Sequence, residues 1–270
     1  MQGYNRRMEL FRELTKLSFQ RQITYRAATL AGLATNFFFG LLRAAVMVAL
    51  YGARPEVAGI SLPDAITYTG LSQASIGFLS LFGWYEIIRS VYSGDIGSDL
   101  LKPMDFYSFW MAQDLGRAIV QFLLRSLPIL AFYALIFHIT TPKDVGQWLA
   151  LAITMILAWL VSFAWRFLVN LSAFWVPNAI GIARVAFTFA WFTSGFLMPL
   201  RFFPDWFARL CYLTPFPYTI NAIIEVYLGL LSGSRLALIL LGQAGWFLGL
   251  SLLSQFILNL GVRKLVIQGG

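Results

Sequence analysis

Three aspartates in one short polar segment, Asp95, Asp99 and Asp105, have the residue type and spacing that best suit chemistry. Clustered carboxylates can bind a metal ion or transfer protons. No histidine lies near these three, and they do not form a paired Asp-x-x-Asp pattern. The chain has one cysteine, Cys211, and one histidine, His138, so we expect no intrachain disulfide and no cysteine- or histidine-based metal cluster. The acidic segment therefore lacks the partners that such chemistry usually requires.

The composition predicts an integral membrane protein. Of the 270 residues, 59% are hydrophobic and 12% charged, and the mean hydropathy is +0.72. One soluble core of this size could not hide so many apolar side chains. The net charge of +8 lies at the ends of apolar runs, without a pattern of base-stacking aromatics. It therefore indicates contacts with lipid headgroups rather than with nucleic acid.

Six apolar runs of membrane-spanning length must position the polar segments. We predict an all-α membrane protein with one transmembrane domain over 1–270 and spans at 27–51, 65–88, 115–139, 148–174, 180–198 and 236–260. Residues 5–22, before the first span, place apolar side chains on one helical face and charged side chains on the opposite face. This pattern predicts an amphipathic helix on the membrane surface.

The basic residues predict the orientation of these spans. On one side lie the arginines and the lysine between Arg6 and Arg26, followed by Arg89, Lys102, Arg117, Arg166, Arg184, Arg263 and Lys264. On the other side lie Arg54, Lys143, Arg201, Arg209 and Arg235. The side richer in arginine and lysine is the cytoplasmic one. Both termini and segment 89–110 are therefore predicted to be cytoplasmic, and segment 199–231 is predicted to lie outside.

The inner segment 89–110 has a small helical pattern of its own. Ser93 or Asp95 could cap a short helix that ends before Pro103. Its apolar face could insert into a groove of a partner protein, or it could rest on lipid headgroups. The residues that we assign to this helix and its end are Asp95, Ile96, Asp99, Leu100, Leu101, Lys102 and Pro103, with Ile96, Leu100 and Leu101 forming the apolar face.

The outer segment 199–231 contains too many prolines to be a span and too many aromatics to be a solvated loop. Asp205 is predicted to cap one short helix, and residues 219–230 form a second. Two such half-helices predict a re-entrant hairpin, whose broken backbone must be buried against protein. Glu225 could face an outer vestibule, but we favour a pair with Arg201 or Arg209. The residues singled out in this hairpin are Pro199, Pro204, Trp206, Pro215 and Glu225.

Arg43 and Arg125 lie inside the predicted spans, where an unpaired charge costs at least a few kcal/mol. Each could line a transport path or form a structural pair, and Arg43 could also extend its charged end to the outer headgroups. Gln121 lies one helical turn before Arg125. Asn36 precedes Phe37 in a run of phenylalanines that could face an amphipathic cation or simply pack between helices. These five residues are the candidates for a substrate path.

The order of these elements resembles the permease of a type-2 ABC exporter over essentially the whole chain. SGDIGSDLLKPMDFYSFW resembles the segment after the second span in the bacterial subfamily that includes viologen-exporter permeases. SGFLMPLRFFPDWFARLCYLTPFPYTINAIIEVYLG resembles that family's region from the fifth span to the hairpin. The resemblance implies ATP-driven export of an amphipathic or hydrophobic substrate across a bacterial cytoplasmic membrane. It also implies two permeases, identical or paralogous, each docked through segment 95–103 on a separate ATPase subunit that binds ATP and Mg²⁺.

Two other classes of function remain as alternatives. A membrane-embedded enzyme acting on lipid would depend on the aspartates of segment 89–110. A channel or secondary transporter would be expected to have inverted-repeat symmetry and acidic residues within its spans, and we recognise neither pattern. No G-x-x-x-x-G-K-[ST] motif occurs, so this chain does not bind nucleotide phosphates by that device.

Overall fold

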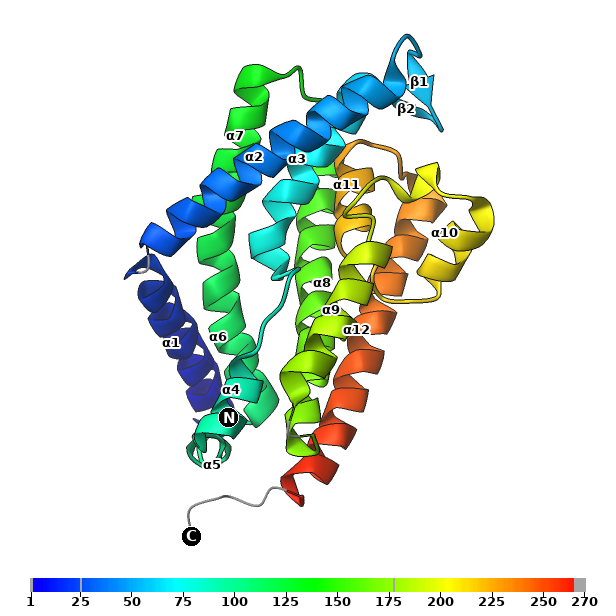
Figure 1. Ribbon diagram of the computed structural model, residues 1–270. Coiled ribbons are helices and arrows are strands. Elements are labelled where there is room, and N and C mark those ends of the chain that lie inside the picture. Colours follow the sequence, from blue (N-terminus) through cyan, green and yellow to red (C-terminus); the bar gives the residue numbers. More distant parts are fainter. Residues whose placement is uncertain (1, 25, 177, 265–270) are drawn as a thin grey trace.

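The computed structural model describes residues 2–24, 26–176 and 178–264, which form a bundle of helices (Figure 1). Within this part of the chain the only strands are two residues long and pair in the loop after α2: β1 (Glu56–Val57) and β2 (Ile60–Ser61). Among the same residues, four helical stretches are long and apolar enough to cross a membrane: Leu30–Tyr51, Phe106–Ile136, Val145–Phe174 and Gly233–Val262. The prediction of an all-α membrane protein is confirmed.

Four predicted elements form helices close to their predicted bounds. They are α1 (Gln2–Thr24), α2 (Arg26–Tyr51), α8 (Val145–Asn170) with the 3-10 turn η2 (Leu171–Phe174), and α12 (Gly233–Val262). No proline interrupts any of them, so their backbone hydrogen bonds continue without a break. Where the structure describes the chain, its first and last helices begin and end at the same end of the bundle as α5 (Figure 1).

The second predicted span, 65–88, is not one helix. Helix α3 (Leu62–Leu79) ends at Ser80, which adopts a left-handed conformation with φ of 49°, and Gly83 follows with φ of 133°. Such angles suit glycine and stop a helix. The chain then resumes as α4 (Glu86–Ser93). Helix α3 is buried around its whole circumference and contacts α2, α6, η1, α7, α8 and α11 (Figure 1).

The third predicted span, 115–139, begins earlier than expected. Helix α6 (Phe106–Gln121) continues through the π-helical turn η1 (Phe122–Ser126) into α7 (Leu127–Ile136). Asp105 caps its start, because its Oδ2 accepts a hydrogen bond of 2.9 Å from the backbone N of Ser108. The first half of α6 packs against α1, where Ser18 Oγ donates to the carbonyl of Gln113 at 2.6 Å. The membrane-surface position of α1 stays a prediction.

The fifth predicted span and the outer hairpin form four shorter elements. They are α9 (Ala179–Thr193), the 3-10 turn η3 (Leu200–Phe202), α10 (Asp205–Tyr212) and α11 (Ile220–Tyr227). Two short helices in segment 199–231 match the prediction. The N-cap of α10 is Pro204 rather than Asp205, which is the first helical residue, so the predicted cap is wrong. The position of this hairpin in the outer leaflet stays a prediction.

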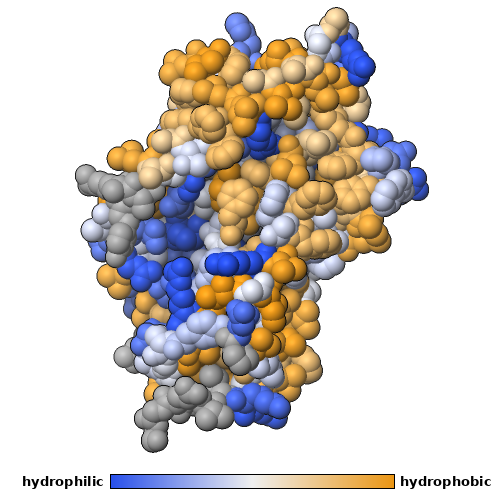
Figure 2. All heavy atoms as spheres, viewed as in Figure 1, coloured by the Kyte–Doolittle hydropathy of each residue, from blue (hydrophilic) through white to orange (hydrophobic). Residues whose placement is uncertain are grey.

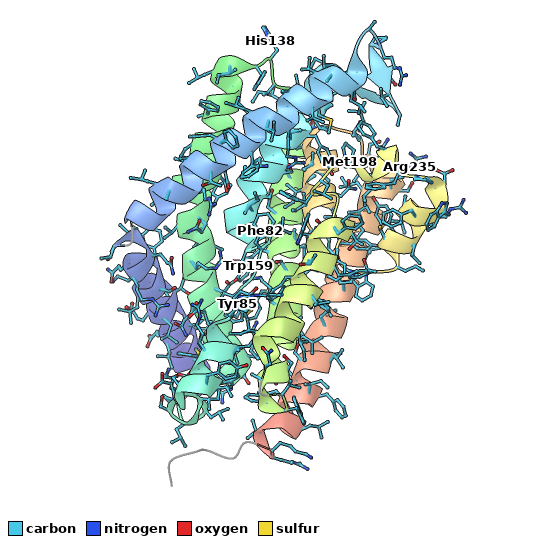
Figure 3. All side chains as sticks on the ribbon, viewed as in Figure 1. Phe82, Tyr85, His138, Trp159, Met198 and Arg235 are labelled. Carbon is cyan, nitrogen blue, oxygen red and sulfur yellow. The ribbon has the colours of Figure 1, made fainter. Side chains whose placement is uncertain are left out.

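Hydrophobic and hydrophilic residues occupy different parts of the surface. In the view of Figure 2, hydrophobic residues dominate over α2 and over the α9 to α12 side, and hydrophilic residues gather towards α1. Side chains fill the spaces between helices (Figure 3). Trp159 lies inside the bundle, whereas His138 lies at the end away from both termini (Figure 3).

Candidate functional site

The short helix α5 (Ile96–Leu100) stands at the end of the bundle that holds both ends of the described chain (Figure 1). Ile96 is 2% exposed and belongs to the aromatic cluster that contains Trp84. Leu101 is 87% exposed. The predicted apolar face of Ile96, Leu100 and Leu101 is therefore wrong as a single face. Ile96 anchors the helix inward, Leu100 is partly buried, and Leu101 points outward.

Asp95 and Asp99, the two aspartates that we assigned to this segment, both accept hydrogen bonds. Asp95 is the N-cap of α5 without a side-chain capping bond, and its Oδ2 instead accepts from Ser93 Oγ at 2.6 Å. Asp99 is buried, accepts from Ser90 Oγ at 2.6 Å and pairs with Lys102 Nζ at 2.5 Å. Among the described residues, no group of three or more His, Cys, Asp or Glu side chains is placed to hold a metal ion.

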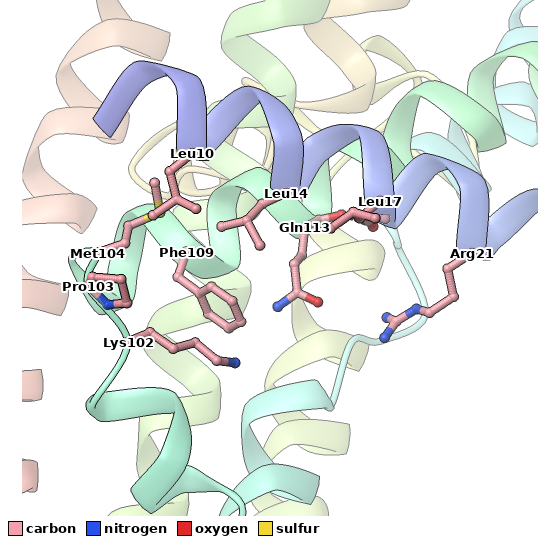
Figure 4. Close-up of a pocket in the computed structure, with 10 residues that line it drawn as sticks. Leu10, Leu14, Leu17, Arg21, Lys102, Pro103, Met104, Phe109 and Gln113 are labelled. Carbon is pink, nitrogen blue, oxygen red and sulfur yellow. Dashed lines mark hydrogen bonds between the residues drawn. The ribbon is translucent and has the colours of Figure 1, made fainter. Parts of the chain in front are cut away.

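A pocket of about 310 Å³ lies between α1 and the chain that joins α5 to α6 (Figure 4). Leucines of α1 form one wall, and Lys102, Pro103 and Met104 lie opposite (Figure 4). The ammonium group of Lys102 lies 3.8 Å from the ring centroid of Phe109, a cation-π contact. The predicted surface helix and the predicted docking segment therefore lie on opposite sides of one pocket.

Two of the candidate path residues, Asn36 and Arg125, meet on one face of α2. Asn36 is buried, its Nδ2 donates to the carbonyl of Gln73 at 3.3 Å, and its Oδ1 accepts from Arg125 Nη2 at 3.1 Å. The same nitrogen of Arg125 donates to the carbonyl of Gly32 at 3.2 Å. Gly32 leaves room for this guanidinium, because a Cβ there would lie 2.9 Å from Arg125 Cζ. The structure thus brings Asn36 and Arg125 together.

Arg43 occupies the same face of α2, seven residues after Asn36. Its Nη1 donates to Ser72 Oγ at 2.9 Å, and its Nη2 donates to the carbonyls of Phe196 and Leu197, the latter at 2.8 Å. The guanidinium also lies 4.7 Å from the ring centroid of Phe196. Arg43 therefore bonds inside the bundle rather than extending to the headgroups.

The two remaining path candidates, Gln121 and Phe37, contact different neighbours. Gln121 packs closely against Gly77, because a Cβ added at Gly77 would lie 2.7 Å from Gln121 Oε1. Phe37 packs against Phe132 with ring centroids 4.3 Å apart, so it contributes to helix packing. We call the set of Asn36, Arg43, Ser72, Gln73, Gln121 and Arg125 the polar seam.

A second buried charge cluster was not anticipated from the sequence. Asp114 of α6 accepts hydrogen bonds of 2.8 Å from Arg166 Nη1 and Nη2 of α8 and of 2.8 Å from Arg117 Nε. Trp159 Nε1 adds a bond of 2.9 Å, so four donors surround one carboxylate. We call Asp114, Arg117 and Arg166 the ion triad. Arg117 and Arg166, which the sequence interpretation counted among the cytoplasmic cations, are held within the protein by Asp114.

The ion triad also closes the break after α3. Arg117 Nη1 donates to the carbonyl of Gly77 at 2.7 Å and Nη2 to that of Phe78 at 3.2 Å, while Ser162 Oγ donates to the carbonyl of Leu79 at 2.8 Å. The last carbonyls of a helix otherwise lack partners. The sequence signal that could have revealed this cluster was Asp114 itself, an acid placed three residues before Arg117 at the start of an apolar run.

The outer hairpin contains an ion pair of its own. Glu225 Oε1 accepts from Arg201 Nε at 2.6 Å, which confirms the predicted pairing of Glu225. Nearby, Asn221 Nδ2 donates to Tyr212 Oη at 3.0 Å. Burial, with a smaller contribution from the carboxylate of Glu225, raises the pKa of the Tyr212 phenol above its ordinary value. The phenol therefore stays protonated and neutral.

The other residues singled out in the hairpin have separate places. Pro199 and Pro204 precede η3 and α10, Pro215 lies in the turn before α11, and Trp206 is exposed. Among the described residues, no group of three or more His, Cys, Asp or Glu side chains that could hold a metal ion forms around them. These residues shape the hairpin.

Comparison with known proteins agrees with this architecture. The model of a family described as ABC-2 family transporter protein matches residues 36–269, which covers most of the chain. No curated protein gives a match. The matched region includes α3, the buried polar seam, α5 and the outer hairpin. The chain therefore belongs to the ABC-2 family of transporter proteins and is a multi-pass membrane permease.

Proposed function

We propose that this permease is the membrane subunit of an ATP-driven exporter that moves an amphipathic or hydrophobic substrate out of the cytoplasm or the inner leaflet. Membership of the ABC-2 family implies association with an ATPase subunit and with the membrane. The chain has no G-x-x-x-x-G-K-[ST] motif, so the partner subunit would bind ATP and Mg²⁺. The assembly would contain two permeases, identical or paralogous, and two ATPase subunits in a bacterial cytoplasmic membrane.

The observation that carries the proposal is the combination of anchoring and exposure in α5. Ile96 is fixed in the aromatic cluster, while Leu101 projects from the protein. Asp99 links α5 to α4 through Ser90 and to the chain after α5 through Lys102. A partner that grips Leu101 would therefore move α5 as a unit. Because α5 packs on α4, that movement would reach the break between α4 and α3.

The position of α5 supports the proposed orientation. It lies at the end of the bundle where α12 ends and where hydrophilic residues gather around α1 (Figures 1 and 2). Arg21 of α1 lines the same pocket as Lys102, and Arg263 follows the last turn of α12 at that end. An excess of cations is typical of the cytoplasmic side. We therefore place both termini and α5 in the cytoplasm.

The test is co-purification of the permease with a co-expressed candidate ATPase. The double variant Leu100→Asp, Leu101→Asp should lose the complex, because charges would replace the apolar contact. Val262→Asp serves as the matched control, since it also places a charge on a half-exposed apolar residue at the same end. Unchanged recovery of ATPase with the double variant, in a protein that elutes as a single folded species, would overturn docking through α5.

A further inference from the structure

The polar seam carries two positive charges that no acid neutralises. Within the described residues, neither Arg43 nor Arg125 lies within 4 Å of an acidic side chain, whereas Arg117, Arg166 and Arg201 each do. Both of the unneutralised residues lie in a membrane-crossing stretch. A charge at such a position is costly unless it is paired or hydrated. The seam therefore has an excess of positive charge that the chain itself does not balance.

Part of its hydrogen-bonding capacity is also unused. In the described part of the chain, Arg125 Nε and Gln121 Oε1 are buried and have no hydrogen-bond partner. Arg125 as a whole is only partly buried. In the face shown by Figure 2, a hydrophilic spot interrupts the hydrophobic surface beside α2. The unpartnered Nε of Arg125 is a donor, and an accepting group on a ligand is one explanation for it.

The charge of the seam selects the sign of that ligand. The aromatic run after Asn36 had suggested a cation, but Phe37 packs on Phe132 and Phe38 is exposed on the outside of α2. Two unneutralised guanidiniums would repel a cation. A planar guanidinium matches the paired oxygens of a carboxylate, phosphate or sulfate.

We propose that the polar seam binds an oxyanion group carried on an apolar body, with Arg43 and Arg125 as its specificity-determining residues. The oxyanion lies against the guanidinium of Arg125, whose Nε is unpartnered, and Arg43 adds positive charge further along the same face of α2. The apolar body lies along exposed leucines of α2 and η1, Leu42 and Leu124. This assignment deepens the proposed function by naming the class of substrate as amphipathic anions. The binding itself does not depend on the partner ATPase.

The experiment measures binding of matched amphiphiles to the purified full-length permease in a neutral detergent. Dodecyl phosphate and dodecyltrimethylammonium have the same alkyl chain and headgroups of opposite charge, so their difference reports the headgroup and not the chain. We expect dodecyl phosphate to bind about tenfold more tightly, as suits a charge-assisted contact with arginine. The double variant Arg43→Gln, Arg125→Gln should lose this preference.

Three further variants make the result specific. Arg125→Gln alone should reduce the preference, and Arg125→Lys should retain part of it, because lysine keeps the charge but not the paired geometry. Arg235→Gln, at an exposed arginine near the hairpin end (Figure 3), should retain all of it. Single variants also cover the case in which the double variant does not fold.

The outcomes separate the possible ligands and functions. Binding of both dodecyl phosphate and phosphatidylglycerol supports the assignment, and binding of phosphatidylglycerol alone supports it with a membrane lipid as the ligand. Equal binding of anion and cation, or a preference that survives in the folded double variant, overturns it. Loss of ATPase co-purification would refute the proposed function without altering these binding results, so the two failures are distinguishable.

Discussion

The ion triad and the polar seam both place arginines inside the bundle, but they balance the charge differently. In the triad, one carboxylate, Asp114, accepts from both Arg117 and Arg166 at 2.8 Å. In the seam, Arg43 and Arg125 donate hydrogen bonds to carbonyls, an amide and a hydroxyl, and to no carboxylate of the described residues. Buried charges are retained cheaply only when they are paired and fully hydrogen-bonded. The difference indicates that the triad holds the bundle together, whereas the seam keeps a charge available for a ligand.

The largest effect should follow the removal of the charge at the centre of the triad. Asp114→Asn would leave two buried arginines without a counter-charge, and breaking a buried pair costs about 3–5 kcal/mol. We expect little folded protein, or a melting temperature far below that of the parent. Size-exclusion yield and thermal unfolding measure this. Glu9→Gln, at an exposed acid of α1, is the control, and similar stability for both variants would refute the role of the triad.

The two regions should respond to different degrees when a single arginine becomes methionine. Arg166→Met breaks a pair that is almost fully buried and should destabilise the protein strongly. Arg125→Met leaves no acid unpaired and removes only hydrogen bonds to Asn36 and to a carbonyl, so the melting temperature should fall much less. The ATPase activity of the reconstituted complex should nevertheless fall severalfold with Arg125→Met. A drop in melting temperature as large as that of Arg166→Met would show that Arg125 is structural.

The sequence predicted those features that depend on local pattern. Long apolar runs without proline, as in α8 and α12, became single helices, and two short helices formed in segment 199–231 on either side of Pro215. The pairing of Glu225 with Arg201 was also predictable, because few cations lie on that side. Features that depend on the third dimension were not. Asp114 meets Arg166 from another helix, 52 residues away, and no periodicity reports such a pair.

The sequence interpretation missed the break after α3 and the inward position of Ile96 for a related reason. Residues 65–88 form one apolar run, and its hydropathy does not show that Gly83 adopts a positive φ that ends a helix. In α5, the spacing of Ile96, Leu100 and Leu101 places them near one another on a helix, but the aromatic cluster beneath takes only Ile96 and part of Leu100. Tertiary packing thus decided which apolar residues faced inward.

The pair between Glu225 and Arg201 offers an intermediate case. Glu225 is buried, but the Arg201 side chain is 33% exposed, so water can reach the cation when the acid is removed. Glu225→Gln should therefore cost about 1–2 kcal/mol, less than the loss at Asp114. Thermal unfolding of the purified permease measures the difference. A loss as large as that of Asp114→Asn would mean that the hairpin pair, and not only the ion triad, holds the bundle together.

The smallest effect should come from the exposed pair of α1. Glu13 Oε2 and Lys16 Nζ are 4.0 Å apart and both side chains are mostly in solvent, where such pairs contribute less than about 0.5 kcal/mol. Glu13→Gln should leave the melting temperature unchanged within error, at low and at high salt. A clear, salt-dependent loss would show that α1 depends on its surface charges, and it would weaken the contrast between buried pairs that determine stability and exposed pairs that do not.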